Sequence, residues 1–357
     1  MSSSGLENER FRLAVDRSTG WVSSIFDKQA KREILAGPAN ELQVLEDKPR
    51  AWDAWNIGLT GVKYPVKFRK MEVVERGPLR ATLRLHYTYL KPGVKKEFPT
   101  EDFPSTFFTQ DITLNSGIDR IDFTTVVDWW EEKTMLKVAF PVAVDDSAAT
   151  YEIPYGTIRR STRNENSFEK AQIEVPSHRW ADLSDGGYGV SLLNRSKYGH
   201  DIKGNVMRLS LLRSPKWPDP TADRGKHVIE YALWPHSGTW SSAGTVRRGY
   251  EYNSPLKAVF VARHRGPEPA VKSYIGLIGN GLILTSVKRA EEGNAWVATL
   301  YNTLSANVNG EMILPRSPKK AVRSDILESS GETLRVSGRS VRVSVGPQGL
   351  AIVRLEW

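Results

Sequence analysis

The 357-residue sequence contains no cysteine. Without thiols it has no disulfide bond, no cysteine-ligated zinc, no iron–sulfur cluster and no cysteine nucleophile. It also lacks an apolar run of about 18 residues, so we predict no membrane-spanning helix and no membrane partner. The first residues carry neither the basic nor the apolar segment of a secretory signal, which favours a cytoplasmic protein.

Histidine is also scarce, with six residues in the whole chain. The sequence has no His-Glu-x-x-His motif, no Gly-x-Ser-x-Gly motif and no phosphate-binding loop. Glycoside hydrolysis needs two carboxylates that face each other across a bond, but Asp128 with Glu131 and Asp145 with Asp146 are only local pairs. We therefore predict no catalytic residue, no metal site and no cofactor within this chain.

The formal net charge is +9, from 50 Lys and Arg against 41 Asp and Glu. Such a balance is compatible with a polyanionic partner. The basic residues form only short pairs, however, and none lies in a nucleic-acid-binding motif. The pairs are Lys95-Lys96, Arg159-Arg160, Arg247-Arg248 and Lys319-Lys320. We interpret the charge as a solvated basic surface and predict no nucleic-acid partner.

What the sequence does contain is a strong period of two. Apolar and polar residues alternate over Leu79–Tyr89, Ile121–Thr125 and Val341–Val345, as in strands with one buried face. The runs Phe11–Val15 and Trp21–Ile25 flank a Ser-Thr-Gly turn and predict a hairpin. Clean helical periods longer than about twelve residues are absent. The expected fold is all-β, with large antiparallel sheets packed as sandwiches.

One stretch has the composition of a domain boundary. The residues Arg263–Ala270 are charged and rich in proline and glycine, and short strand patterns follow them to the C-terminus. We therefore predict a large β-sandwich domain over residues 1–265 and a small C-terminal β-sandwich over residues 266–357.

Aromatic residues accompany polar ones at several points. The segments Trp52–Asn56 and Asp128–Glu132 mix tryptophan with carboxylates, a composition that suits stacking on a sugar ring. The alternative is that these are ordinary core and rim aromatics of a sandwich. A polar segment, Asn194–Asn205, follows an apolar strand, and we interpret it as a loop of the kind in which binding residues concentrate.

Several motifs, in order, resemble one family. The runs Glu174–Ser184, Gly187–Asn194 and Lys197–His200 are similar to the non-catalytic half of class II α-mannosidases, glycoside hydrolase family 38. Segments typical of its cytosolic and prokaryotic branch are Asp16–Gly20, Trp52–Asn56, Val127–Glu131, Leu136–Pro141, Pro218–His227 and Tyr231–Gly238. The resemblance extends from about residue 8 to the C-terminus.

This resemblance implies a large sandwich similar to that of galactose mutarotases, followed by a small one. The family hydrolyses terminal α-mannosidic bonds with retention, using zinc, an aspartate nucleophile and an acid/base carboxylate. Those groups lie in an N-terminal barrel, to which this chain has no counterpart. We therefore expect a region that is inactive alone, with zinc in the barrel. The implied partners are the barrel, an α-mannoside and a second copy of this chain.

The resemblance also implies site residues. It places Tyr198 to Gly204 in a loop bordering the mannose pocket, so the candidate substrate-binding residues are Tyr198, His200, Asp201 and Lys203. Lys203 stands where relatives often carry arginine, and lysine lacks the bidentate fork of a guanidinium. Residues expected to brace loops or line the pocket rim are His178, Arg179, Asp182, Asp219, Asp223, His227 and His236.

Two other functions stay open at this point. The aromatic and polar segments are also compatible with a stand-alone carbohydrate-binding β-protein. A sugar 1-epimerase would share the large sandwich, but it needs a histidine–glutamate pair that no spacing in the sequence identifies.

Overall fold

The computed structural model describes residues 4–89 and 106–357; the basic pair Lys95-Lys96 lies outside them. The chain divides into two compact units. The large unit comprises Met1–Ile153 and Ile158–Asn253, and the small unit comprises Pro154–Thr157 and Ser254–Trp357. The sequence predicts a domain boundary after residue 265, whereas the second unit of the structure begins at Ser254.

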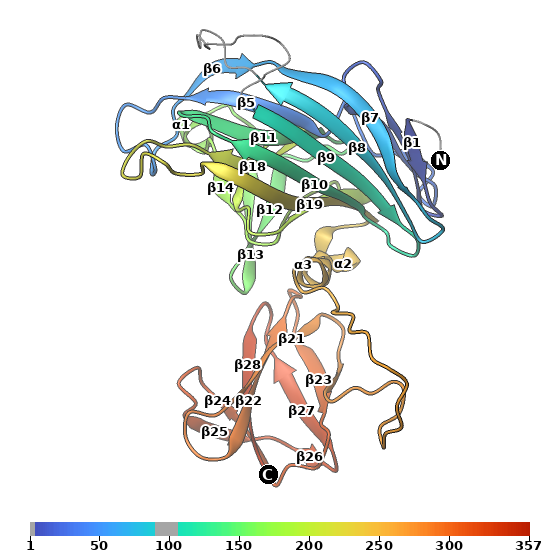
Figure 1. The fold of residues 1–357 in the computed structure, drawn as a ribbon. Coiled ribbons are helices and arrows are strands. Elements are labelled where there is room, and N and C mark those ends of the chain that lie inside the picture. The colour runs from blue at the N-terminus through green and yellow to red at the C-terminus, as the bar shows by residue number, and fades with distance from the viewer. Residues whose placement is uncertain (1–3, 90–105) are drawn as a thin grey trace. The chain divides into compact units, whose positions relative to one another are not determined.

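The largest element of the large unit is a nine-stranded sheet (Figure 1) with the order β13-β12-β15-β16-β19-β10-β9-β8-β7. Its strands are β7 (Val66–Arg76), β8 (Arg80–Tyr89), β9 (Thr106–Asn115), β10 (Ile121–Trp129), β12 (Ala148–Ile153), β13 (Gly156–Ser161), β15 (Trp180–Ser184), β16 (Tyr188–Asn194) and β19 (Gly225–Ser237). Neighbouring strands such as β8 and β9, or β10 and β19, pair antiparallel.

A six-stranded sheet and a four-stranded sheet complete the large unit. The six-stranded order is β14-β17-β18-β11-β5-β6. Its strands are β5 (Glu41–Asp47), β6 (Leu59–Tyr64), β11 (Thr134–Pro141), β14 (Val175–Pro176), β17 (Gly199–Lys203) and β18 (Val206–Arg213). The N-terminal sheet contains β1 (Gly5–Glu7), β2 (Phe11–Val15), β3 (Val22–Asp27) and β4 (Arg32–Glu33). The β2–β3 pairing confirms the predicted hairpin.

The nine-stranded and six-stranded sheets share one hydrophobic core. Along β10 the residues Ile121, Phe123 and Val127 are buried and alternate with more exposed neighbours. Phe123 meets Phe140 of β11 with ring centroids 5.4 Å apart, so side chains of the two sheets interdigitate. The predicted period of two therefore describes this face correctly, except that Leu79 precedes β8 and is exposed.

Three short helices supplement the sheets: α1 (Ser167–Ala171), α2 (Trp240–Ala243) and α3 (Thr245–Asn253). Helices α2 and α3 cover the β15–β16 part of the nine-stranded sheet. Trp180 of β15 stacks on Trp240, and a Cβ at Gly249 would lie 2.8 Å from the Trp180 ring. No helix within residues 4–89 and 106–357 is both long and apolar enough to cross a membrane.

The small unit is built from two antiparallel sheets. One has the order β20-β23-β27-β26 and the other β21-β22-β28-β24-β25. Their strands are β20 (Gly276–Ile278), β21 (Leu282–Arg289), β22 (Ala295–Asn302), β23 (Val308–Ile313), β24 (Lys320–Ser324), β25 (Ser330–Thr333), β26 (Val336–Ser337), β27 (Ser340–Val345) and β28 (Leu350–Glu356). The turn after β27 carries the chain from one sheet to the other, and the predicted all-β class is confirmed throughout.

A buried polar network crosses the core of the large unit. The Tyr231 hydroxyl of β19 donates to Asn40 Oδ1 over 3.0 Å, and it accepts from Gln110 Nε2 of β9 over 3.1 Å. It also lies 2.9 Å from Thr125 Oγ1 of β10. All four side chains are buried. Buried polar groups that are fully paired fix one arrangement of a core, because any alternative leaves some of them unsatisfied.

We expect Tyr231→Phe to lower the free energy of unfolding by about 1–3 kcal/mol. Removing this hydroxyl takes the 3.0 Å bond from Asn40 Oδ1 and the 3.1 Å bond from Gln110 Nε2, which then keep only longer bonds inside the core, among them those of 3.3 Å to each other. Urea unfolding followed by circular dichroism measures the change. The matched control is Tyr155→Phe, since the Tyr155 side chain is exposed; equal effects of the two variants would contradict the role of the network.

Candidate functional site

The segment Trp52–Asn56, which the sequence singles out for its aromatic residues, meets a third tryptophan that lies outside the two predicted aromatic segments. The loop between β5 and β6 brings Trp52 and Trp55 against Trp217, which follows β18. The Trp217 ring centroid lies 4.7 Å from that of Trp52 and 5.3 Å from that of Trp55. We call these three residues the tryptophan cluster.

The tryptophan cluster is not part of the core. The exposed fractions of Trp52, Trp55 and Trp217 are 58%, 65% and 47%. Trp52 also has a backbone φ of 60°, in the left-handed region that bulky residues rarely adopt. Such strain persists only where surrounding contacts enforce it, and it concentrates at functional sites. The loop therefore holds exposed aromatic rings on a strained backbone, at Trp52.

Buried contacts anchor the base of this loop. Asp47 at the end of β5 accepts the backbone N–H of Gly58 over 2.7 Å and the Arg213 Nε over 2.7 Å. Arg213 also donates to the carbonyl oxygens of Ala54 and Asn56. A Cβ at Gly58 would lie 2.5 Å from the backbone of the facing residue, so only glycine closes the loop without a shift.

Charged side chains surround the tryptophan cluster. Glu132, after β10, pairs with Lys216 Nζ at 2.5 Å and with the Arg224 guanidinium. The hydrogen bond from Lys216 holds the pKa of Glu132 below its usual range, so the carboxylate stays ionised. Asp53 accepts the backbone N–H of Lys216 over 3.3 Å, and the Ala54 N–H donates to the Trp217 carbonyl over 3.2 Å. These contacts tie both loops together.

Three of the predicted rim residues brace the loop that carries Trp217. Asp219 accepts the backbone N–H and the hydroxyl of Thr221, both over 2.8 Å. Asp223 accepts the Arg213 backbone N–H over 2.9 Å, and His227 Nε2 lies 2.9 Å from the Asp223 carbonyl oxygen. The structure therefore places Asp219, Asp223 and His227 in a supporting position beside the tryptophan cluster.

The predicted substrate-binding loop is not a loop. Gly199–Lys203 forms strand β17, because it pairs with β18 through a tight turn at Gly204. His200 and Asp201 are buried, at 0% and 2% exposure. Their adjacency in a strand points them to opposite faces, and both faces of β17 are covered at this point. Two of the four candidates therefore have no surface on which to bind a sugar in this chain.

Asp201 belongs to a buried charge cluster. It pairs with Lys137 Nζ of β11 at 2.5 Å and with Arg208 Nε of β18 at 2.7 Å. Lys137 is fully buried and also pairs with Glu174 at 2.7 Å. Each charge has an opposite neighbour, which buried charges require. Nothing in the periodicity of β11 distinguishes Lys137 from a solvent-facing lysine, so the sequence did not reveal this cluster.

The remaining candidates are scattered. Tyr198 is 54% exposed, and its ring lies tilted by 42° against that of His178, with ring centroids 5.7 Å apart. Lys203 Nζ donates to the Glu169 carbonyl over 3.2 Å. Arg179 forms an ion pair with Glu152 at 2.9 Å.

Two histidine–carboxylate pairs form that sequence spacing did not identify. His236 Nε2 lies 2.8 Å from Asp182 Oδ2, and both side chains are buried under Trp234 and helix α3. His86 Nε2 of β8 lies 2.6 Å from Glu72 Oε1 of β7, on the outward side of that hairpin. The first pair has no access to substrate. The second is a partly exposed ion pair.

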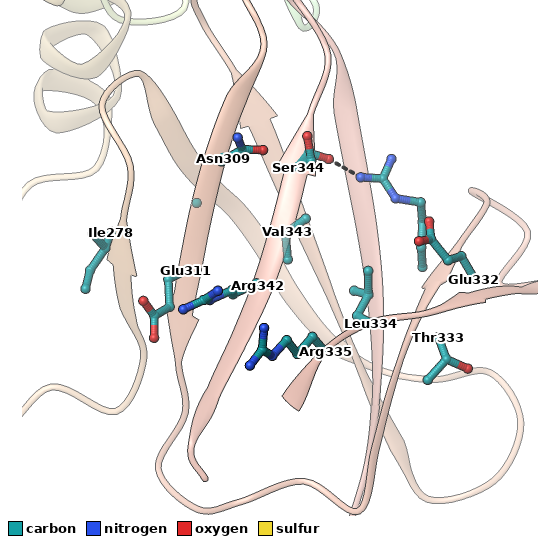
Figure 2. A pocket seen from close by; sticks show the side chains of 12 residues that line it. Ile278, Asn309, Glu311, Glu332, Thr333, Leu334, Arg335, Arg342, Val343 and Ser344 are labelled. Carbon is teal, nitrogen blue, oxygen red and sulfur yellow. Dashed lines mark hydrogen bonds between the residues drawn. The ribbon is translucent and has the colours of Figure 1, made fainter. Parts of the chain in front are cut away.

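The small unit contains a separate cavity of about 640 Å³. Figure 2 shows Glu311, Arg335 and Arg342 on one side of it and Glu332 on the other, with Val343 and Leu334 between them. Arg323 also lines it and donates to the Ser344 carbonyl. None of the predicted site residues lies in this cavity.

The residues that the structure describes do not form a zinc-binding group. Across residues 4–89 and 106–357, no three histidine or carboxylate side chains gather in a group that would hold a metal. Zinc in proteins takes three or four such ligands. The described residues thus contain no zinc site from which a metal-assisted step could be derived.

Comparison with known proteins gives the family. The model of the glycosyl hydrolases family 38 C-terminal domain matches residues 6–221. The model of the glycosyl hydrolases family 38 C-terminal beta sandwich domain matches residues 281–348. The chain therefore belongs to glycosyl hydrolase family 38, as its C-terminal region, and the resemblance read from the sequence motifs is confirmed.

Individual relatives agree. The chain is 34% identical over 331 residues to alpha-mannosidase 2C1 of Homo sapiens, covering 90% of this chain and 30% of that protein. It is 32% identical over 305 residues to an alpha-mannosidase of Saccharomyces cerevisiae, covering 81% and 27%. The chain thus spans under a third of the length of these relatives. An alpha-mannosidase structure from Enterococcus faecalis shares the fold, with a TM-score of 0.83, 16% identity, and coverage of 99% of this chain and 42% of that one.

We expect stability to fall on mild acidification because of His200. Burial lowers its pKa from 6.5 to about 4. Between these values the unfolded chain binds a proton that the native chain excludes, so the free energy of unfolding rises with pH across this window. His200→Gln should flatten the slope in urea unfolding series at different pH. The control His264→Gln changes an exposed histidine; a slope unchanged by His200→Gln would contradict the assignment.

Lys137→Met should lower the free energy of unfolding by about 3–5 kcal/mol, because it removes the buried cation that Asp201 shares with the partly buried Glu174 and leaves Asp201 with Arg208 alone. The control Lys203→Met removes a partly exposed lysine from strand β17 of the same sheet and should cost about 1 kcal/mol or less. Thermal or urea unfolding compares the two. A loss for Lys137→Met no larger than for the control would show that the buried cluster is not structural.

Proposed function

We propose that this chain is the non-catalytic C-terminal part of a retaining α-mannosidase, which packs on a catalytic barrel and borders the mannose pocket. The observation that carries the proposal is that both C-terminal domain models of family 38 match in order along the chain. Relatives that are named α-mannosidases are more than 30% identical to this chain, over about 30% of their own length. The zinc, nucleophile and acid/base carboxylate would then come from the barrel.

The contacts of the described residues favour a structural role for this region over a catalytic one. The histidines and carboxylates that the resemblance singled out mostly pair with protein groups, as in His236 with Asp182 and Asp201 with Lys137. Among the four candidate substrate-binding residues, Tyr198 offers the largest open side chain. We propose that Tyr198 and His178, whose rings are in contact, lie on the pocket border, with Lys203 holding helix α1.

The proposed partners are an α-mannoside and the catalytic barrel, whether it is joined to this chain or separate. We propose a cytoplasmic location, in line with the resemblance of the sequence motifs to the cytosolic and prokaryotic branch of the family. A second copy of this chain is a further proposed partner, because exposed aromatic side chains such as Phe168 and Trp130 offer contact surface.

We expect the purified chain to give no turnover of p-nitrophenyl α-mannoside, with or without added zinc, because the proposal assigns the nucleophile and the zinc to the barrel and residues 4–89 and 106–357 hold no group of metal ligands. Release of nitrophenolate measures the reaction. An α-mannosidase relative assayed in parallel serves as the positive control. Zinc-dependent turnover by this chain alone would overturn the proposal.

A further inference from the structure

The tryptophan cluster is the feature that the proposed function does not use. Trp52, Trp55 and Trp217 come from two loops that the buried clamp of Asp47 and Arg213 joins. The rings meet edge to face or tilted, at interplanar angles of 71° and 51° to Trp217. Such packing leaves ring faces open, which agrees with their exposure.

We propose that the tryptophan cluster is a carbohydrate-binding surface, which takes a pyranose ring of an α-linked mannoside. The axial C–H bonds of a pyranose form an apolar face that matches an open indole ring. The choice of a mannoside rests on the proposed function, whereas the stacking surface stands on the geometry alone.

Polar groups around the rings suit the hydroxyl groups of a sugar. Asp53 Oδ2 accepts the Lys216 N–H, and Oδ1 has no hydrogen-bond partner among the residues that the structure describes. Lys216 and Glu132 contribute an ion pair beside Trp217. Sugar recognition needs this combination of an apolar floor with a few oriented donors and acceptors.

The same loop borders an open cavity of about 540 Å³. Ala51 and Asn56 lie in its wall, next in sequence to Trp52 and Trp55. This volume falls in the range of about 300–1,000 Å³ for small-molecule sites. None of the three tryptophans lines this cavity, so it adjoins the loop and not the ring faces.

The size of the cluster favours a sugar over a protein. With about 150–250 Å² per tryptophan side chain, three half-exposed rings offer roughly 300 Å². A stable protein contact needs about 800 Å² on each side and a depletion of charge at its centre. Here Lys216 and Asp53 lie immediately beside the rings, so the surface fits a ligand the size of a sugar ring.

The test is a titration of the purified chain, followed by tryptophan fluorescence and calorimetry. The ligands are methyl α-mannoside, an α-linked mannobiose and mannitol. Mannitol carries comparable hydroxyl groups but has no ring face. We expect the mannosides to bind with a Kd of about 1 mM, and mannitol to cause no change. Absence of any mannoside response at about 10 mM would overturn the inference.

Variants locate the site. Trp217→Ala and Trp55→Ala should each weaken mannoside binding at least tenfold. Trp52→Gly should do the same while preserving the thermal unfolding temperature, since glycine adopts a φ of 60° without strain. The matched control is Trp130→Ala, because Trp130 is 59% exposed and makes no ring contact with the cluster in the described structure.

The binding titration can fail independently of the proposed function, because the test of that function measures turnover of an α-mannoside and not its binding. Equal weakening by Trp130→Ala, or binding that survives all three cluster variants, would place the sugar elsewhere and overturn the inference. Loss of self-association in Trp217→Ala without any mannoside effect would assign the tryptophan cluster to protein contacts, and it would also overturn the inference.

Discussion

Face-to-face packing of the nine-stranded sheet on the six-stranded sheet is the constraint on which the large unit depends. Each strand must turn one face inward, so every second residue is committed to the core. The buried network around Tyr231 then ties β9, β10 and β19 of the larger sheet to Asn40, which directly precedes β5, because the amide and hydroxyl groups pair there. The loops at the strand ends inherit their positions from this arrangement.

The fate of the polar residues follows from the same constraint. Where both faces of the six-stranded sheet are covered, charges such as Lys137 and Asp201 survive only as partners of one another. At the strand ends, polar residues instead brace loops, as Asp47 does for the segment that carries Trp52. The polar side chains described above are thus mostly structural, whereas the tryptophan cluster is distinguished by exposed rings that contact one another.

Family membership and local geometry answer different questions. The match to both C-terminal models assigns the chain to glycosyl hydrolase family 38 as its C-terminal region. It does not identify which surface contacts sugar, because a domain match names no binding residue. The tryptophan cluster points to a surface on physical grounds, and it joins residues 160 or more positions apart.

The sequence by itself determined the all-β class, the β2–β3 hairpin and the family, because alternation, turn residues and ordered motifs are local signals. It misassigned Gly199–Lys203 as a loop, since polar residues in a strand covered on both faces look like those of a loop. Only the tertiary structure decided that His200 and Asp201 are buried and that Trp52 meets Trp217. Pairing between distant segments depends on sheet order, which no local pattern encodes.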